Sequence, residues 1–153
     1  MTRLRKLLSV SAPDRYLLVG AVFLCGAIRV GLWLLPLRAF QRALCRISQR
    51  SDRLGREDQI SPERIAWAVD VASRFVPGST CLTGALATQV LLERRNHRAC
   101  LYLGLTRTPS DGIKGHAWVE GEKGVVIGGR DLSQYVPLAS WERLPRGEGL
   151  RGR

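Results

Sequence analysis

The sequence contains few of the side chains on which metal sites and disulfide-stabilised folds are built. It has two histidines, His97 and His116, and four cysteines with no Cys-x-x-Cys pair and no histidine at zinc-finger spacing. This scarcity argues against a metal centre. The cysteines also lack the dense pattern of a secreted disulfide framework, and three of them lie among apolar neighbours, where a free cysteine packs as a small hydrophobe. We therefore expect no metal ion and a reducing, cytoplasmic compartment.

Acidic side chains are also scarce. The chain has 13 Asp and Glu against 24 Lys and Arg, a formal net charge of +11, and residues 1–60 alone hold 11 basic against 4 acidic side chains. A basic surplus favours acidic peptides, anionic lipid or nucleic acid, but it is as often an ordinary solvated surface. No motif that reads RNA or DNA accompanies it, so we expect no nucleic-acid partner.

The sequence lacks a long apolar run without a charged side chain. The run from Tyr16 to Leu37 approaches the length of about 20 residues that spans a bilayer, but Arg29 lies near its middle. A charge at that depth costs about 2.5 to 3.5 kcal/mol on insertion scales. Apolar residues in the run recur at helical steps, which predicts a helix that packs one face on protein. Peripheral membrane contact and a true span stay open as alternatives, and no small-residue cleavage site follows to indicate a secretory signal.

The length of 153 residues suffices for one folded domain. Composition divides the chain into a basic, helical N-terminal arm at residues 1–50, a polar linker at 51–60 and a catalytic domain at 61–153. The arm is a candidate for contact with a partner protein or with a membrane surface. The sequence shows no internal repeat and no low-complexity segment.

The predicted catalytic domain begins with two helices. Ser61 followed by Pro62 is a strong helix start, and Pro77-Gly78 ends this first helix. A Ser79-Thr80 cap then opens a second apolar-striped helix at Cys81. Both helices carry their apolar residues on one face, which predicts that they pack on a common core.

Alternating apolar residues downstream of the helices predict a small antiparallel sheet. Residues 99–106, 116–120 and 125–127 have the strand pattern, and Gly121 to Gly124 is typical of a tight hairpin turn between the last two. Two helices followed by these strands predict an α+β fold, in which a helix with cysteine at its N-terminus packs on the sheet.

Three residues in these elements form a candidate catalytic set. Cys81 opens a helix, where exposed N–H groups favour the thiolate that attacks carbonyl carbon. His116 lies in one strand and Asp131 follows the next, so an antiparallel pair could bring the two side by side. A nucleophile, a base and an orienting carboxylate are what a thiol hydrolase or acyl transferase needs. Their order along the chain is that of a papain-like or transglutaminase-like core, which we predict.

Each of these residues has a simpler explanation when taken alone. Cys81 could be buried packing, His116 a satisfied core histidine, and Asp131 a turn residue, so only the combination favours catalysis. Glu120 and Glu122 are rival orienters of the imidazole. The first shares a strand face with His116 only two positions away, and the second lies in the predicted hairpin turn. Asp131 is therefore the better candidate.

Two tryptophans are candidate substrate-binding residues. Trp118 shares the strand face of His116, and Trp67 lies on the first helix of the domain, where a lone tryptophan is more often part of the core. The backbone N–H of Cys81 is a natural first donor to an oxyanion, whereas the sequence indicates no second donor. We expect no cofactor.

Several segments resemble one enzyme family. The similarity spans roughly residues 60–140 and is densest in Cys81-Leu-Thr-Gly-Ala-Leu-Ala and Gly115-His-Ala-Trp-Val-Glu, with Leu91-Leu-Glu-Arg-Arg and Leu101-Tyr-Leu-Gly-Leu between them. These segments look like the transglutaminase-like leader peptidases of lasso peptide biosynthesis, the B proteins. The apolar N-terminal stretch that ends in Leu35-Pro36-Leu37 is similar to the helical N-terminal part of that family.

The resemblance implies a cysteine protease that removes the leader from a ribosomally made precursor peptide. An ATP-dependent cyclase would then close a macrolactam at the freed amino terminus. In this family Cys81 would be the nucleophile, His116 the base and Asp131 the orienter. Because residues 1–60 show little strand pattern, the chain resembles the split form of the family. That form needs a separate leader-recognition protein, for which the N-terminal arm is a candidate docking surface.

Two other functions stay open at this stage. A transglutaminase-like acyl transferase would form the same thioester but resolve it with an amine, so its product joins two groups. A membrane-associated binding module would be catalytically silent, and its Cys81 would react with a thiol probe no faster than Cys25, Cys45 or Cys100.

Overall fold

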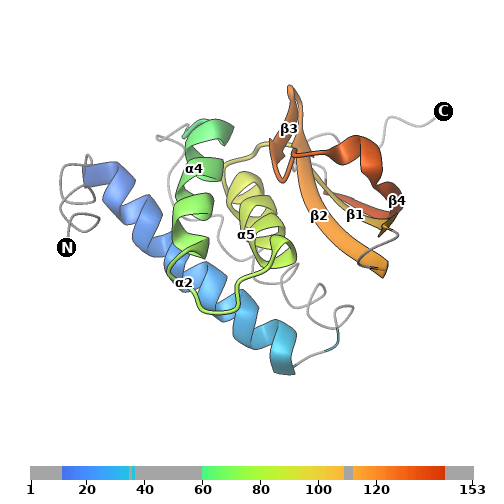
Figure 1. Ribbon diagram of the computed structural model, residues 1–153. Helices are drawn as coiled ribbons and strands as arrows, with labels where there is room; N and C mark the ends of the chain where they lie inside the picture. Colours follow the sequence, from blue (N-terminus) through green and yellow to red (C-terminus); the bar gives the residue numbers. More distant parts are fainter. Residues whose placement is uncertain (1–11, 35, 37–59, 109–111, 144–153) are drawn as a thin grey trace.

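Three α-helices lie on one side of an antiparallel sheet in the computed structural model of the protein (Figure 1), which describes residues 12–34, 36, 60–108 and 112–143. The predicted α+β fold is confirmed. The elements are helices α2 (Ala12–Leu34), α4 (Pro62–Ser73) and α5 (Cys81–Arg94), strands β1 (Ala99–Thr108), β2 (Gly112–Gly121), β3 (Gly124–Ile127) and β4 (Val136–Arg143), and the 3-10 helix η1 (Leu132–Gln134).

The sheet has the strand order β3-β2-β1-β4, and every neighbouring pair is antiparallel. The predicted hairpin joins β2 to β3, with Gly121 opposite Gly124. The sequence patterns did not predict β4, which pairs with β1 on the other edge. Its Pro137 is compatible with a strand at the sheet edge, where an N–H can be missing without breaking a central ladder.

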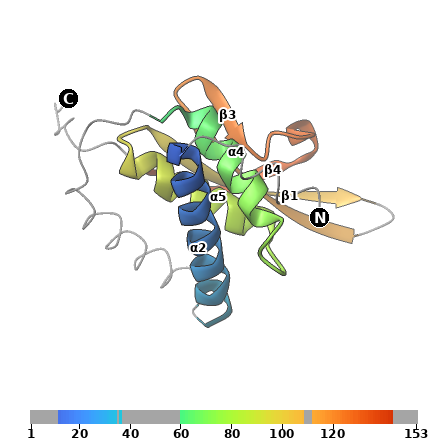
Figure 2. The same ribbon diagram turned by 90° about the vertical axis from the view of Figure 1, so that its left-hand side faces the viewer.

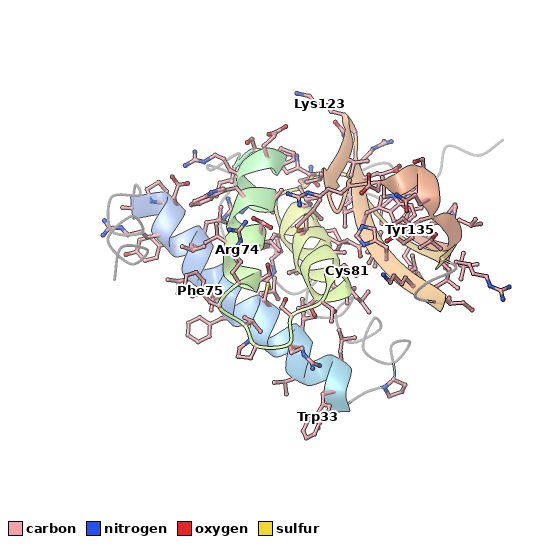
Figure 3. The ribbon with its side chains drawn as sticks, viewed as in Figure 1. Trp33, Arg74, Phe75, Cys81, Lys123 and Tyr135 are labelled. Atoms are coloured by element: carbon pink, nitrogen blue, oxygen red, sulfur yellow. The ribbon has the colours of Figure 1, made fainter. Side chains whose placement is uncertain are left out.

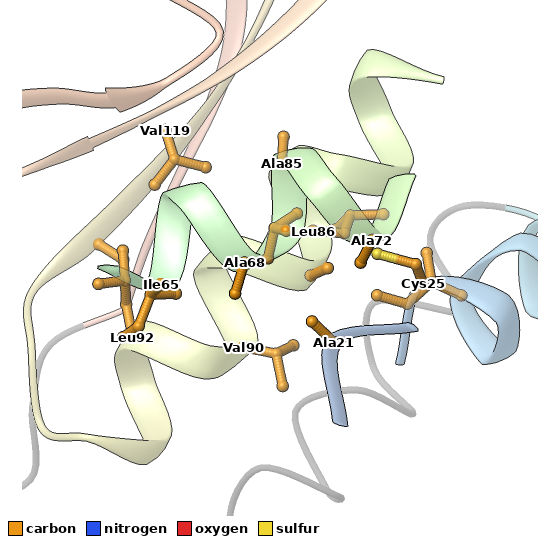
Figure 4. Close-up of a cluster of buried hydrophobic side chains, with 14 of the residues drawn as sticks. Ala21, Cys25, Ile65, Ala68, Ala72, Ala85, Leu86, Val90, Leu92 and Val119 are labelled. Atoms are coloured by element: carbon orange, nitrogen blue, oxygen red, sulfur yellow. The ribbon is translucent and has the colours of Figure 1, made fainter. Parts of the chain in front are cut away.

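Small side chains allow the three helices to pack closely. Ala21 and Cys25 of α2, Ala68 and Ala72 of α4, and Ala85 of α5 are all buried (Figure 4). Helices approach most closely where the contacting side chains are small. Helix α5 contacts β1 and β2 on one side and α4 and α2 on the other, so it forms the middle layer of the fold.

Helix α2 belongs to this core. Its inner face is buried against α4 and α5, as the helical spacing predicted, and Leu17 and Ile28 lie in the same cluster as Ala21 and Cys25. Within the described residues it is also the one helix that is long and apolar enough to cross a membrane. The predicted linker at 51–60 lies outside the described residues, except for Ile60.

Arg29, the charge in the middle of the apolar run, packs against the loop that precedes Cys81. Its guanidinium group lies beside Gly78, where a Cβ atom would be 3.0 Å from a guanidinium nitrogen. Gly78 has a φ of +69°, a conformation that glycine adopts without steric cost. The contact links α2 to the segment that carries the candidate nucleophile.

Candidate active site

Cys81 is the first residue of α5, as predicted from its sequence context. Thr80 is the N-cap, and a reciprocal capping box joins it to Thr83, whose N–H donates to Thr80 Oγ1 at 3.4 Å. This box satisfies helix-end donors and fixes the point at which the helix begins. The Cys81 side chain is exposed. The structure thus presents a free thiol at a well-defined helix N-terminus (Figure 3).

His116 is held in β2 by a hydrogen bond to the backbone. Its Nε2 lies 2.7 Å from the carbonyl oxygen of Gly128, just beyond β3. Because a carbonyl can only accept, Nε2 donates and therefore carries the proton in this bond. The Nδ1 atom of a neutral imidazole then has the free lone pair, and it is the nitrogen available to take a proton from a thiol.

Gly128 can hold this carbonyl in place because it has no side chain. Its φ is +80°, and a Cβ atom there would lie 2.7 Å from the carbonyl oxygen of Ala117 and 3.0 Å from Trp118 Cβ. Both the backbone conformation and the close approach of β2 require glycine. The antiparallel pairing of β3 with β2 thus brings a backbone acceptor, just after β3, to the imidazole.

Two aromatic rings flank the imidazole of His116. The Tyr135 ring centroid lies 4.9 Å away at an interplanar angle of 32°, and the Trp118 ring stacks at 6.2 Å. Tyr135 follows η1, in a segment whose structure the sequence patterns did not predict. A single tyrosine in a short polar segment gives no periodic signal from which its position could be predicted. It lies beside the histidine because β4, which begins at the next residue, pairs with β1.

Cys81 and His116 line one cleft of about 900 Å³ between α4, the start of α5 and the β2–β3 edge of the sheet. Trp67 of α4 and Arg74, which caps the end of that helix, line the same cleft together with Arg130. No hydrogen bond joins the thiol to the imidazole in the described part of the chain. In many unliganded enzymes such contacts are long and shorten only when substrate binds.

Asp131 lies next to this cleft but not in its lining. It follows the lining residue Arg130, is exposed, and has a φ of +54°. Among the described residues no hydrogen bond joins its carboxylate to His116, and the Gly128 carbonyl is the acceptor that the imidazole contacts instead. The role of Asp131 as an orienter therefore stays a prediction.

The rival carboxylates that sequence reasoning set aside have other partners. Glu120 Oε1 accepts a hydrogen bond from Trp118 Nε1 at 3.1 Å, and Glu122 lies 3.9 Å from Arg98 in an exposed ion pair. Neither lines the cleft that contains Cys81.

The two tryptophans have different environments. Trp67 is 42% exposed and lines the cleft, which fits its predicted contact with substrate. Trp118 is 5% exposed and stacks on Tyr102 at 5.4 Å, and its contact with substrate stays a prediction. Gly104 leaves room for its ring, since a Cβ atom there would be 2.9 Å from it. Trp118 stacks beside His116 and is not among the residues that line the cleft.

A thiol at the first residue of a capped helix and a histidine on an antiparallel sheet line one cleft, and these are the two groups that Cys–His catalysis uses. A family model described as the transglutaminase-like superfamily matches residues 23–140, well over half of the chain. The protein belongs to that superfamily, which includes cysteine proteases and acyltransferases. The match begins inside α2 and ends in β4. No curated protein and no solved structure matches the chain.

A brief pulse of iodoacetamide at about pH 8 is expected to alkylate Cys81 first, because the thiolate is the reactive form. Cys81 is exposed, whereas burial of Cys25 raises the pKa of its thiol to about 11 and leaves little thiolate at that pH. Trypsin places Cys81 in peptide 75–94 and Cys25 in peptide 16–29, so mass spectrometry separates the two. Unfolding in urea should equalise their rates. Equal rates in the native protein would contradict the structure.

Proposed function

We propose that the protein is a cysteine endopeptidase that removes the leader from a ribosomally made lasso peptide precursor. The observation that carries the proposal is that Cys81, at the capped start of α5, lines the same cleft as His116. The sequence segments around these two residues are also those in which the resemblance to the B proteins is densest. Membership of the transglutaminase-like superfamily supports the chemistry, and the resemblance supports the choice of substrate.

The proposed reaction begins when the imidazole Nδ1 takes the proton of the Cys81 thiol. The thiolate then adds to the carbonyl carbon of the scissile amide, and the imidazolium returns the proton to the departing amine as the C–N bond breaks. Water hydrolyses the thioester with His116 as the base, which frees the carboxylate of the leader and restores the thiol. Substrate binding must bring Sγ and Nδ1 within hydrogen-bond reach for the first step.

The start of α5 supplies donors for the negatively charged oxygen of the intermediate. The N–H of Thr83 donates to Thr80 Oγ1, and that of Gly84 donates to the Thr80 carbonyl. The N–H groups of Cys81 and Leu82 have no acceptor among the described residues, as expected for the first turn of a helix. We therefore assign Leu82 N–H as the second oxyanion donor, which the sequence did not reveal.

Gly128 and Asp131 have complementary roles in this proposal. The Gly128 carbonyl fixes the tautomer of His116, because it accepts from Nε2. A neutral carbonyl cannot offset the full positive charge that the imidazole acquires, whereas a nearby carboxylate can. Asp131 lies three residues along the same segment and is the proposed source of that negative charge.

Asp131→Asn is expected to slow cleavage by roughly tenfold to a hundredfold, the effect of removing one nearby opposite charge. The loss is smaller than for the nucleophile or base, because the asparagine leaves the Gly128 hydrogen bond intact. The readout is the initial rate of precursor cleavage by mass spectrometry. Glu122→Gln is the matched control, since Glu122 pairs with Arg98 outside the cleft. If both variants cleave at the wild-type rate, Asp131 has no part in the reaction.

The proposed partners are the precursor peptide, a separate leader-recognition protein that delivers it, and a cyclase that uses the freed amine. The decisive experiment incubates the full chain with the precursor peptide, with and without the leader-recognition protein, and measures product masses. Two fragments whose masses sum to the precursor plus one water support the peptidase. A product that joins the acyl fragment to an added amine would instead identify the transglutaminase-like acyl transferase. Full-length chain is needed, because removing α2 would uncover the core.

A further inference from the structure

The outer face of α2 carries a continuous apolar stripe that no described residue covers. Opposite the buried face, positions at alternating three- and four-residue steps form a row that we call the outer stripe: Tyr16, Val19, Phe23, Gly26, Val30 and Trp33. All of them except Gly26, which is half-buried, are exposed. The three aromatic side chains are 82%, 75% and 79% exposed, respectively. Single exposed apolar residues are ordinary, but a contiguous apolar patch on a soluble domain indicates an interaction surface. Figure 2 views the molecule from the side of α2.

The charge along the sequence of α2 and of the residues that follow it is almost entirely positive. Asp14 is the single acidic residue of α2, and it pairs with Arg64 of α4. From residue 15 to residue 51 the sequence has no Asp or Glu, but it has six arginines: Arg15, Arg29, Arg38, Arg42, Arg46 and Arg50. A second copy of this chain docked on the stripe would bring two such cationic stretches together. An anionic surface would be complementary to them.

The types and spacing of the aromatic residues fit the interface of a bilayer. Tyr16 and Trp33 are amphipathic side chains, which favour the headgroup level of a membrane. They stand about 25 Å apart along the helix at 1.5 Å per residue, with Phe23 between them. An apolar helix face together with basic residues in and after the helix sequence is the pattern of a helix that lies in the membrane interface.

We propose that the outer stripe of α2 binds the surface of a bilayer that contains anionic lipid, with the helix parallel to the membrane plane. The helix does not cross the bilayer, because its inner face buries Ala21 and Cys25 against α4 and α5. The catalytic domain thereby sits on the membrane with α2 lying in the membrane surface. This proposal is independent of the peptidase proposal, since it rests on α2 and not on the cleft.

The test is flotation of the full chain with vesicles of phosphatidylcholine alone or mixed with phosphatidylglycerol. The wild-type protein should float with the anionic vesicles, and Phe23→Glu/Trp33→Glu should reduce the bound fraction by about tenfold or more. Ile113→Glu/Leu138→Glu is the matched control, because Ile113 and Leu138 are 69% and 65% exposed but belong to the sheet. The control should float like the wild type, and thermal unfolding should show that both variants are folded.

Three results would overturn the proposal. One is failure of the folded wild-type protein to float with anionic vesicles, and another is an equal loss of binding in the stripe and control variants. The third is a stripe variant that binds lipid normally but loses self-association or binding to the leader-recognition protein, since the stripe would then be a protein interface. Raising the salt from about 0.1 to 1 M, where the Debye length falls from about 10 to 3 Å, should weaken binding. Cleavage of the precursor in free solution should not change in the stripe variant, whatever its lipid affinity.

Discussion

Cys81→Ala is expected to lower the rate of precursor cleavage by more than about 10⁴-fold, because no thioester can form without the sulfur. The fold should survive, since the Cys81 side chain is exposed and the capping box of α5 uses Thr80 and Thr83 instead. Binding of the precursor should also survive, because the cleft loses only one sulfur atom. The measurement is the initial cleavage rate, together with the affinity for a fluorescently labelled precursor.

Cys100→Ala is the matched control for this variant. It removes another free cysteine that is partly accessible, but from β1 and not from the lining of the cleft. Its cleavage rate should equal that of the wild-type protein. Retention of cleavage in Cys81→Ala, or its loss in a folded Cys100→Ala protein, would remove Cys81 from the mechanism.

His116→Ala is the second large effect that we expect, a loss of about 10² to 10⁴-fold in cleavage, the usual contribution of a positioned general base. The imidazole is needed twice, to take the thiol proton and to activate water for hydrolysis of the thioester. Added imidazole should restore part of the activity, because the deleted ring leaves a space beside the Gly128 carbonyl in which a small base can bind. Such rescue distinguishes lost proton transfer from lost structure.

His97→Ala is the matched control, because His97 is the second of the two histidines in the sequence. Its Nε2 bonds to the carbonyl of Ile60 at 3.0 Å, and it lines a separate pocket at the start of α4. Cleavage should be unaffected, and imidazole should have no effect. A His116→Ala protein that is folded and fully active would contradict the assignment of the base.

Local signals predicted the position of the candidate nucleophile. The Thr80 cap, the break at Pro77-Gly78 and the apolar stripe of the following helix all act within a few residues of Cys81, and the structure confirms that α5 begins there. The β2–β3 hairpin was predicted for the same reason, since a tight glycine turn fixes the pairing of its flanking strands.

The features of the site that the sequence patterns did not predict depend on contacts between residues that are far apart in the sequence. Strand β4 forms because β1 offers its second edge, and that pairing brings Tyr135 to His116. The hydrogen-bond acceptor at the imidazole is the backbone carbonyl of Gly128. Because every residue has a backbone carbonyl, the sequence offered no reason to expect this acceptor in place of the Asp131 carboxylate. Trp118 has the strand-face periodicity of His116, but periodicity does not show that Gly104 opens a space to bury its ring.

The helical nature of α2 was also predictable, but its place in the fold was not. The apolar spacing indicated one packed face, which the structure shows, whereas the close contact with α4 depends on small residues of both helices. Cys25 and Ala72 can be recognised as packing residues only once both helices are seen to contribute to the same core. Composition alone therefore did not show that α2 packs in the same core as α4 and α5.

Cleavage is expected to pass through an acyl-enzyme on Cys81, which acid quenching of the reaction can trap. Mass spectrometry of the quenched and digested protein should find the leader fragment attached as a thioester to peptide 75–94, which contains Cys81 as its one cysteine. Hydroxylamine should release it, and Cys81→Ala should not form it. An acyl group found on peptide 99–107, which carries Cys100, or cleavage without any covalent intermediate would contradict the account.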